Sequence, residues 1–480
     1  MNRYIFCSVV WLILLTGYLN AQTTTIPDTN FEQALIDLGI DSDGVINNSV
    51  LTSDVASVLS LNVSGKGIMQ LTGIEDFISL SELYCQDNLL TSLSLNTNTK
   101  LIILDCSEND LSSLKITDLV DLRVLKCSFN KITGINLSSN KLLEEFYCDH
   151  NLIKTLNLKD NLELIVLNCA NNQFTVLTIT FNWKLKYLNF SSNLFDYIDL
   201  VNNVKVEYLD CSNNPLTSIF LNNMTQLQTI YMVDNDLLTD VNFSHNYNLE
   251  EIVCRDNDLL TSINLSAALA LKYLDCSNNS LIELQTLYNP LLENLYCQNN
   301  QIKTLDLSQN PNLTFLKCND NQLEALDLKN GSNDLMAGGI TKYDGQFIYV
   351  DGMDARNNLP LFCIQVDNEK DASLGLAPYD SWFKDEVVSY FENCEVNLGI
   401  DQQVLNNSIC VYPNPSENHV FIKADNQQIK KVVIYSILGR SVKEYDSKFE
   451  NLSVKAISPG LYLIRIYTEK GVAVKRFIIK

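Results

Sequence analysis

Cysteine recurs at a nearly constant interval along this chain. The interval is 21 residues between Cys85, Cys106, Cys127, Cys148 and Cys169; Cys211 keeps the frame, Cys254 and Cys276 follow steps of 22, and Cys297 and Cys318 return to 21. The two skipped positions hold Phe190 and Met232, which are also apolar. A period near 21 predicts a stack of similar coils. Such a stack presents a long repeated surface rather than a single pocket.

The residues around each cysteine repeat with it. Leu80, Leu83, Cys85, Asn88, Leu90, Leu93 and Leu95 recur as Leu313, Leu316, Cys318, Asn321, Leu323, Leu326 and Leu328. The unit reads L-x-x-L-x-C-x-x-N-x-L-x-x-L-x-L and holds through twelve consecutive copies. This pattern resembles the leucine-rich repeat of bacterial proteins, with Cys in the last slot of L-x-x-L-x-L. The resemblance implies a mostly β solenoid.

Each slot of the unit has a physical role. Leu83 and Cys85 alternate inward on a short strand, and Leu93 and Leu95 alternate in the same way on the far side, where a second strand is expected. The asparagine sits at the turn, where its side chain can satisfy backbone groups that no sheet partner reaches. We therefore expect a buried structural ladder formed by Asn88, Asn109, Asn130, Asn151, Asn172, Asn193, Asn214, Asn235, Asn257, Asn279, Asn300 and Asn321.

The ends of the solenoid need caps, because a terminal coil exposes apolar surface. Residues 26–36 read as a short capping helix with Asn30 as its N-cap, and Trp382, Phe383, Tyr390 and Phe391 have spacings suited to a second one. The predicted domains are a signal peptide at 1–21, an N-terminal cap at 22–57, a solenoid at 58–367 with an irregular insertion at about 329–358 (Gly-rich at 336–352), a C-terminal cap and linker at 368–409, and a last domain at 410–480.

Most cysteines are expected to be reduced despite the export signal. Side chains in register on adjacent strands point the same way at about 4.8 Å, which does not suit a disulfide. We read these cysteines as small buried hydrophobes. Cys363 and Cys394 lie off the interval and flank the last repeat, so they are the candidates for a disulfide that seals the core.

Residues 410–480 differ in composition from the rest. They hold twelve Lys or Arg against six Asp or Glu, while the whole chain has a net charge of −23. The segment opens with Tyr412-Pro413-Asn414-Pro415, contains Gly460-Leu461-Tyr462, and ends in a basic strand. It resembles the C-terminal sorting domain of proteins exported by type IX secretion in gram-negative bacteria. The resemblance implies a small antiparallel β-sandwich that engages the secretion machinery and is then removed.

The sequence offers no catalytic constellation. Its three histidines are His150, His245 and His419, and no C-x-x-C, H-E-x-x-H, G-x-S-x-G or P-loop pattern is present. We therefore expect no enzyme activity, cofactor or metal. An acidic solenoid is a poor match for nucleic acid. No stretch after the signal is long and apolar enough to span a bilayer, so an integral membrane protein is not expected.

Aromatic and charged residues alternate at the outward positions beside each cysteine strand. Tyrosines there can anchor a partner at little entropic cost, although β-propensity alone also favours them. The candidate ligand-binding residues are Tyr187, Tyr208, Tyr231, Tyr273 and Tyr296. We expect a recognition protein, secreted or on the outer cell surface, that binds a protein or glycan. The alternative is a structural envelope or matrix protein without a dedicated ligand.

Overall fold

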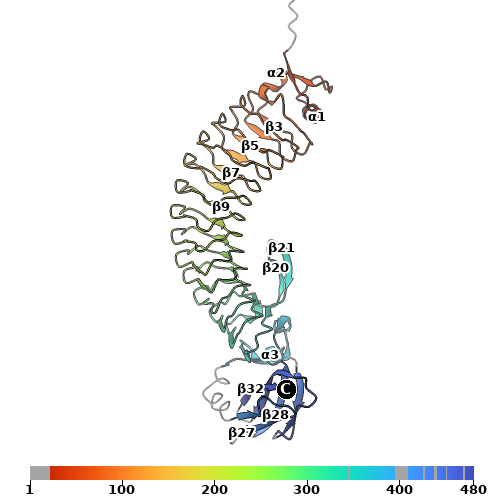
Figure 1. Cartoon of the computed structure of the whole chain (residues 1–480), viewed down its shortest axis with the longest axis vertical. Helices are drawn as coiled ribbons and strands as arrows, with labels where there is room; N and C mark the ends of the chain where they lie inside the picture. Colours follow the sequence, from red (N-terminus) through yellow and green to blue (C-terminus); the bar gives the residue numbers. More distant parts are fainter. Residues whose placement is uncertain are drawn as a thin grey trace, which may run out of the picture. The chain divides into compact units, whose positions relative to one another are not determined.

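The computed structural model describes residues 22–343, 346–394, 409–424, 428–436, 441–449, 451–468 and 471–480. The signal peptide expected at 1–21 and the linker residues 395–408 lie outside this range. The described residues form two units, within Met1–Leu143 and Glu144–Lys480, which are treated separately below (Figure 1).

The first unit begins with a cap. Strands β1 (Thr23–Thr25) and β2 (Ser49–Leu51) pair antiparallel. Helix α1 (Thr29–Asp37) lies between them in the sequence, and α2 (Thr52–Val55) follows β2. The expected N-cap at Asn30 is wrong, because Asp28 holds that role: its Oδ1 accepts the amides of Asn30 and Phe31 at 3.0 and 3.1 Å. The Asp28 carboxylate also binds the amides of Met69 and Gln70 through Oδ2, at 2.7 and 3.0 Å. One carboxylate therefore joins the capping helix to the first coil.

The coils of the first unit stack through parallel strands. Adjacent strands pair in register, so the central leucine of each strand lies beside the central leucine of the next strand. The short η1 turn (Ile74–Asp76) closes the first coil. The strands are β3 (Ser60–Asn62), β4 (Glu82–Tyr84), β5 (Ile103–Asp105) and β6 (Val124–Lys126).

The second unit continues the same repeat in a long parallel sheet. Its central side chains point inward and pair in register, as Leu188 does with Leu209 and Leu209 with Ile230. The strands of the long sheet are β7 (Glu145–Tyr147), β8 (Val166–Asn168), β9 (Tyr187–Asn189), β10 (Tyr208–Asp210), β11 (Thr229–Tyr231), β13 (Glu251–Val253), β15 (Tyr273–Asp275), β16 (Asn294–Tyr296), β18 (Phe315–Lys317), β22 (Met353–Asp354) and β24 (Trp382–Phe383).

The opposite side of these coils, here called the reverse face, is strand only in places. The expected second strand forms in β12 (Asp240–Asn242), β14 (Ser262–Asn264), β17 (Thr304–Asp306), β19 (Ala325–Asp327), β23 (Cys363–Gln365) and β25 (Ser389–Phe391). Other coils keep the inward alternation of the two leucines, as Ile198 and Leu200 are 3% and 2% exposed, without sustained pairing. The far side is therefore set by leucine burial rather than by a continuous ladder of strands.

Two features recur along the regular coils. The residue before each ladder asparagine has a left-handed backbone, with φ between 50 and 59° from Asp87 to Asp320. The ladder asparagine then bonds neighbouring coils: Asn193 Oδ1 accepts from the amide of Phe174 at 3.0 Å, and its Nδ2 donates to the carbonyls of Cys169 and Phe190, both at 3.0 Å. Eleven of the twelve expected asparagines are buried, and Asn172 is half-buried.

The sequence prediction missed a second asparagine ladder. These side chains are fully buried and donate to carbonyls of the preceding coil, as Asn182 Nδ2 does to Leu158 and Asn161 at 3.2 and 2.8 Å. The signal was an asparagine three residues before the leucine that opens a coil, as Asn182 precedes Leu185. Its members are Asn98, Asn140, Asn161, Asn182, Asn203, Asn246, Asn289 and Asn310, while Leu119, Met224 and Ala268 take the position elsewhere.

The C-terminal end of the solenoid departs from the regular coil. A hairpin of β20 (Gly339–Tyr343) and β21 (Gln346–Val350) projects from the coils after η2 (Asn333–Leu335) (Figure 1). The asparagine ladder then resumes after the hairpin. Asn358 Nδ2 donates to the carbonyls of Cys318 and Ala355 at 3.1 and 3.0 Å.

The expected helix over Trp382–Phe391 is wrong. Trp382–Phe383 and Ser389–Phe391 add strands to the two faces, with η3 (Tyr379–Ser381) before them. The cap's helix is instead α3 (Glu369–Leu374), capped by Asn368, whose side chain accepts the amide of Asp371 at 3.0 Å. The aromatic residues come as two adjacent pairs, which suit two short strands as well as a helix, and this explains the error.

The last domain is a small antiparallel β-sandwich. One sheet contains β26 (Ile409–Tyr412), β27 (His419–Ala424) and β30 (Leu452–Ser453). The other contains β29 (Ser441–Tyr445), β28 (Ile429–Ser436), β31 (Gly460–Thr468) and β32 (Gly471–Ile479). Both sheets contribute to one apolar core, which includes Val420, Val432, Ile464 and Phe477.

Candidate functional site

Three of the predicted tyrosines form a continuous stack on the outer surface of the long sheet. The rings of Tyr187 and Tyr208 lie parallel with centroids 4.5 Å apart, and Tyr208 meets Tyr231 at 5.8 Å. Strands β9, β10 and β11 position them, because the residues flanking each inward leucine must face outward. All three side chains are half-buried, so the stack presents ring surface to solvent. We call Tyr187, Tyr208 and Tyr231 the tyrosine stack.

The other two predicted tyrosines lie in a separate group. Tyr273 contacts Tyr296 at 5.6 Å, and Tyr296 contacts Phe315 at 4.6 Å. Strand β13, with Glu251 and Val253 at its outward positions, separates them from the tyrosine stack. Tyr296 and Phe315 are only 2% and 5% exposed, so this group offers little free surface. The five candidates therefore do not form one uniform row.

Carboxylates accompany the tyrosine stack. Asp210 faces outward on β10 beside Tyr231 in the sheet register, and its Oδ1 accepts the amide of Ser212 at 3.1 Å. Burial raises the pKa of Asp210, and burial also raises the pKa of the Tyr208 hydroxyl. Tyr231 donates its hydroxyl hydrogen to Glu251 Oε1 at 2.6 Å. The stack is therefore an aromatic surface in an acidic setting.

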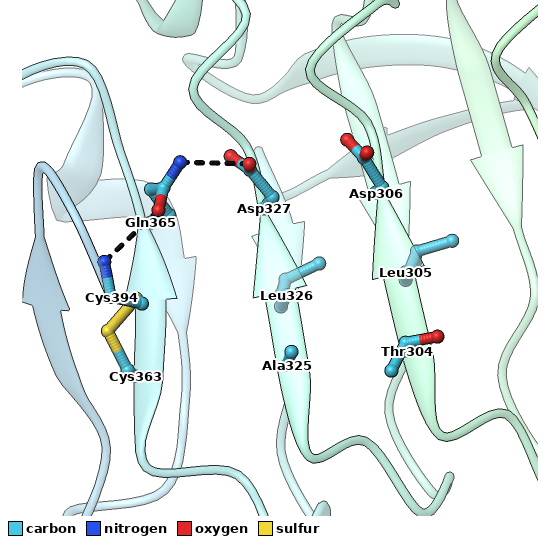
Figure 2. Close-up of a pocket in the computed structure, with 9 residues that line it drawn as sticks. All are labelled: Thr304, Leu305, Asp306, Ala325, Leu326, Asp327, Cys363, Gln365 and Cys394. Carbon is cyan, nitrogen blue, oxygen red and sulfur yellow. Dashed lines mark hydrogen bonds between the residues drawn. A yellow bond between two sulfur atoms is a disulfide. The ribbon is translucent and has the colours of Figure 1, made fainter. Parts of the chain in front are cut away.

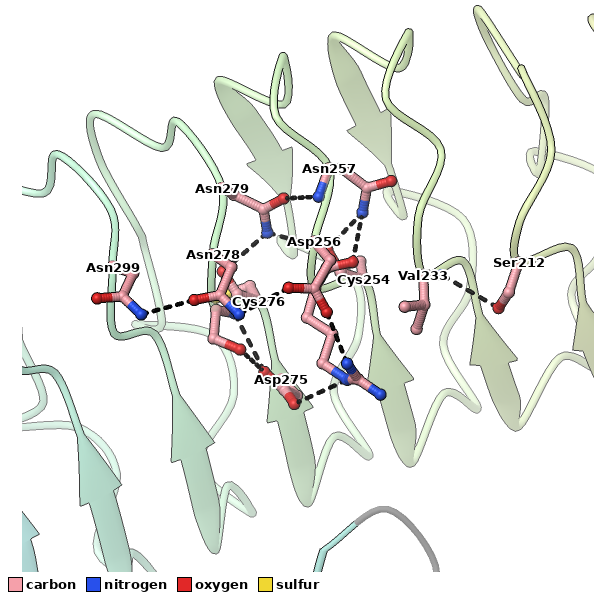
Figure 3. A network of polar contacts seen from close by, with 12 residues as sticks. Ser212, Val233, Cys254, Asp256, Asn257, Asp275, Cys276, Asn278, Asn279 and Asn299 are labelled. Atoms are coloured by element: carbon pink, nitrogen blue, oxygen red, sulfur yellow. Dashed lines mark hydrogen bonds and ion pairs between the residues drawn. The ribbon is translucent and has the colours of Figure 1, made fainter.

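In the next coils the acidic side chains are held by an arginine and by asparagines of the protein itself. Arg255 reaches Asp256 Oδ2 with Nη1 at 2.6 Å and lies 3.8 Å from Asp275 through Nε (Figure 3). Asn278 donates to Asp256 Oδ1 at 2.7 Å, and Asn299 donates to Asn278 at 2.6 Å. Asp275 follows the inward Leu274 on β15 and is nevertheless only 1% exposed. This network ties coils together, whereas no arginine within the described part of the chain forms an ion pair with Asp210.

A hollow of about 170 Å³ lies beside the Cys363–Cys394 disulfide. Figure 2 shows Gln365 bridging its wall: Nε2 donates to Asp327 at 2.8 Å, and Oε1 accepts the amide of Cys394 at 3.1 Å. Asp306 and Asp327 are partners in register on β17 and β19, and burial raises the pKa of Asp327. The disulfide fastens residues around Cys394 to the last coil, so this hollow belongs to the capping structure.

The remaining chemistry is sparse in the described part of the chain. No group of three or more His, Cys, Asp or Glu in that part is arranged to hold a metal ion. Among the same residues, no helix has the length and apolarity that a membrane crossing requires. The ladder cysteines are buried thiols, and burial raises the pKa of such thiols as those of Cys85 and Cys169. Such thiols are held away from reaction by their surroundings.

Comparisons with solved structures agree with this architecture. The functional domain of InlJ from Listeria monocytogenes, described as including a cysteine ladder, matches with a TM-score of 0.51 and 22% identity over 96% of this chain and 99% of that one. The internalin InlF from the same organism gives a TM-score of 0.53 and 20% identity over 62% and 91%. A leucine-rich repeat protein from Leptospira interrogans gives 0.51 and 19% over 70% and 97%. A search of curated sequences found no match.

The fold defines the chain as a leucine-rich repeat solenoid protein with a cysteine ladder. Residues 410–480 match the family model described as the secretion system C-terminal sorting domain. The chain thus combines a leucine-rich repeat fold with a sorting domain for secretion, as its sequence predicted. The sorting domain implies export.

Proposed function

We propose that the solenoid is an exported recognition module that binds a protein ligand through the tyrosine stack. The observation that carries this proposal is the open row of Tyr187, Tyr208 and Tyr231, held on three adjacent strands. Strands fix their backbones, so the rings bind without a large cost in chain ordering. Half-buried aromatic residues at the centre of a rigid surface are typical binding hot spots.

The charge around the stack supports a basic partner. Asp210 and Glu251 lie beside the rings, and the chain as a whole carries −23. A lysine or arginine from the partner would meet both a carboxylate and an aromatic face, which attracts cations. Burial raises the pKa of Asp210, so a cation placed beside it would recover part of the lost solvation. An anionic ligand such as nucleic acid is disfavoured by the same charges.

The sorting domain supports an extracellular setting for this encounter. We infer that residues 410–480 bring the chain to the type IX secretion machinery and are removed during export. The mature protein would then be secreted or displayed on the outer surface of a gram-negative bacterium. An envelope or matrix protein without a dedicated ligand is the alternative, and a glycan in place of a protein is a second one.

The decisive experiment uses the exported protein as bait against extracellular proteins of its environment. A captured partner should bind saturably, and its affinity should fall by about tenfold or more in the Tyr208→Ala/Tyr231→Ala variant. Tyr247→Ala is the matched control, since Tyr247 is 51% exposed but lies outside the long sheet. Equal affinity of the wild type and the double variant would contradict the proposed surface, and the absence of any saturable partner would favour the structural alternative.

A further inference from the structure

Apolar side chains gather on the reverse face, on the opposite side of the coils from the tyrosine stack. Val176, Tyr197, Val201 and Phe220 are 69, 50, 51 and 64% exposed. They come from three successive coils, because Val176 and Tyr197 are one period apart and Phe220 follows in the next coil. Single exposed hydrophobic residues are common on proteins, but a contiguous group marks an interaction surface.

Three of them, Tyr197, Val201 and Phe220, border a hollow of about 430 Å³ between two neighbouring coils. Tyr197, Asp199 and Val201 line it from one coil, while Phe220, Asn222 and Asn223 line it from the next. Ile198 and Leu200 alternate with the first three and are buried, which fixes the direction of the lining side chains. The hollow is therefore part of the repeating framework rather than of a loose loop.

The polar groups of the hollow are only partly used by the protein. Asp199 Oδ1 accepts the amide of Val201 at 3.0 Å, and Asn223 Nδ2 donates to the carbonyl of Val201 at 3.1 Å. The second oxygen of Asp199 and the amide oxygen of Asn223 have no hydrogen-bond partner among the described residues. The hollow thus combines two exposed rings with a carboxylate and two carboxamides.

No basic residue lines this hollow. Lys184 and Lys205 belong to the neighbouring stretches of the same coils, but their ammonium groups lie 5.5 and 4.8 Å from the centre of the Trp183 ring. An anionic ligand therefore finds no counter-charge in the lining. The lining suits a neutral ligand that has apolar faces for the rings and several hydroxyl donors for the oxygens.

We propose that the hollow between Tyr197 and Phe220 is a binding site for a neutral oligosaccharide. A sugar ring presents C–H groups on its face, which pack on aromatic rings, and hydroxyl groups at its edge, which donate to carboxylate and amide oxygens. The coils are spaced by about 4.8 Å, so a saccharide chain lying along the solenoid meets a new set of outward side chains at each coil. This site is independent of the protein-binding role proposed for the tyrosine stack.

The test uses the exported protein and four neutral probes: cellohexaose, laminarihexaose, maltohexaose and chitohexaose. Calorimetry should detect binding of at least one, and Tyr197→Ala and Phe220→Ala should each weaken it by about tenfold. Tyr208→Ala, on the tyrosine stack, should leave saccharide affinity unchanged. Asn223→Asp should weaken binding less than Phe220→Ala, because an acceptor is kept.

Two results would overturn the proposal. One is the absence of binding by all four hexasaccharides at millimolar concentration, with circular dichroism showing that the protein is folded. The other is binding that survives both Tyr197→Ala and Phe220→Ala, or that is lost in Tyr208→Ala instead. In the first case, loss of a captured protein ligand in Phe220→Ala would assign the hollow to a protein interface instead.

Discussion

Tyr187 and Tyr208 stack face to face on adjacent strands, with ring centroids 4.5 Å apart and planes inclined by 4°. The stack arises from a period of 21 residues, which brings identical side chains to the same outward position of neighbouring coils. Each ring covers one face of its neighbour, and the outer surfaces stay accessible to a partner. Stability and recognition can therefore be measured separately at this pair.

The first prediction concerns that pair. Replacing Tyr187 and Tyr208 with Ala, singly and together, should reveal a coupling of about 0.5–1.5 kcal/mol in the free energy of unfolding. The reason is that each ring loses its stacking partner in the other's absence. Urea unfolding of the four proteins measures the cycle. Tyr187 with Tyr273 is the control pair, because β10, β11 and β13 lie between their strands in the sheet. Equal coupling in both cycles would contradict the stacking contribution.

The second prediction concerns the first asparagine ladder. Asn193→Ala should lower the free energy of unfolding by about 1–3 kcal/mol, since it leaves the buried amide of Phe174 without its acceptor and removes one hydrogen bond each from the carbonyls of Cys169 and Phe190. Asn202→Ala, which removes an exposed hydrogen bond to the carbonyl of Thr180, should cost much less. Thermal and chemical unfolding compare the two variants. Similar losses would mean that the ladder contributes no special stability.

The third prediction separates the two ladders. Asn203→Met should be tolerated better than Asn193→Met, because Met224 occupies the position equivalent to Asn203 in the next coil. Asn203 makes two side-chain hydrogen bonds, to the carbonyls of Ile179 and Asn182, and its buried Oδ1 has no partner in the described structure. Chemical unfolding of both variants gives the comparison. A larger loss for Asn203→Met would reverse the order we expect.

The fourth prediction concerns alkaline pH. Burial raises the pKa of Cys85, Cys106, Cys169, Cys211, Cys254, Cys276, Cys297 and Cys318. In the unfolded chain a thiol ionises at about 8.5, so the unfolded state releases protons that the folded state keeps. The stability contributed by these thiols is complete below about pH 8.5 and is lost as the pH rises above it.

Chemical unfolding at several values between pH 7 and pH 9.5 tests this dependence. In Cys211→Ala the free energy of unfolding should fall less steeply above pH 8.5. The difference in slope should approach about 1.4 kcal/mol per pH unit, the contribution of one thiol. Thiol reagents should label the folded protein slowly at the ladder positions. An unchanged slope in Cys211→Ala, or rapid labelling of the folded ladder, would contradict burial of the protonated thiols.

The fifth prediction concerns export. A chain truncated after residue 409 should fold its solenoid but stay in the periplasm of a host with type IX secretion. The reason is that the sorting domain at 410–480, which directs export, is missing. Fractionation and immunoblotting locate the protein. As a control, the same domain fused to an unrelated periplasmic protein should carry it out. Normal export of the truncated chain would refute the sorting role.

The repeat made much of the fold predictable from sequence. Any residue that recurs with the cysteines must occupy equivalent sites in stacked coils, so the inward leucines and Asn193 could be placed directly. Irregular segments lack this constraint, which is why the expected helix at Trp382–Phe391 proved to be strands. The N-cap was misplaced because Asp28 is selected by two distant amides, Met69 and Gln70, as well as by its own helix.

The candidate site was predictable only in part. The period places Tyr187, Tyr208 and Tyr296 on outward positions, but it does not say which of them keep free surface. Tyr296 is 2% exposed and contacts the rings of Tyr273 and Phe315 on neighbouring strands, and the period alone does not predict which rings cover one another. The reverse-face hollow was not anticipated, because the aromatic rings of Tyr197 and Phe220 do not recur at the equivalent positions of other coils.

The return of the asparagine frame at Asn358 has an evolutionary consequence. Asn321 and Asn358 are 37 residues apart in sequence, yet Asn358 still bonds to the carbonyl of Cys318 as a next-coil asparagine does. Each coil needs only its immediate neighbour, so a gene can duplicate or delete one repeat, or accept a foreign hairpin between two, and still encode a continuous core. Unequal recombination among these similar repeats can thus lengthen or shorten the molecule in whole coils and vary its binding surface.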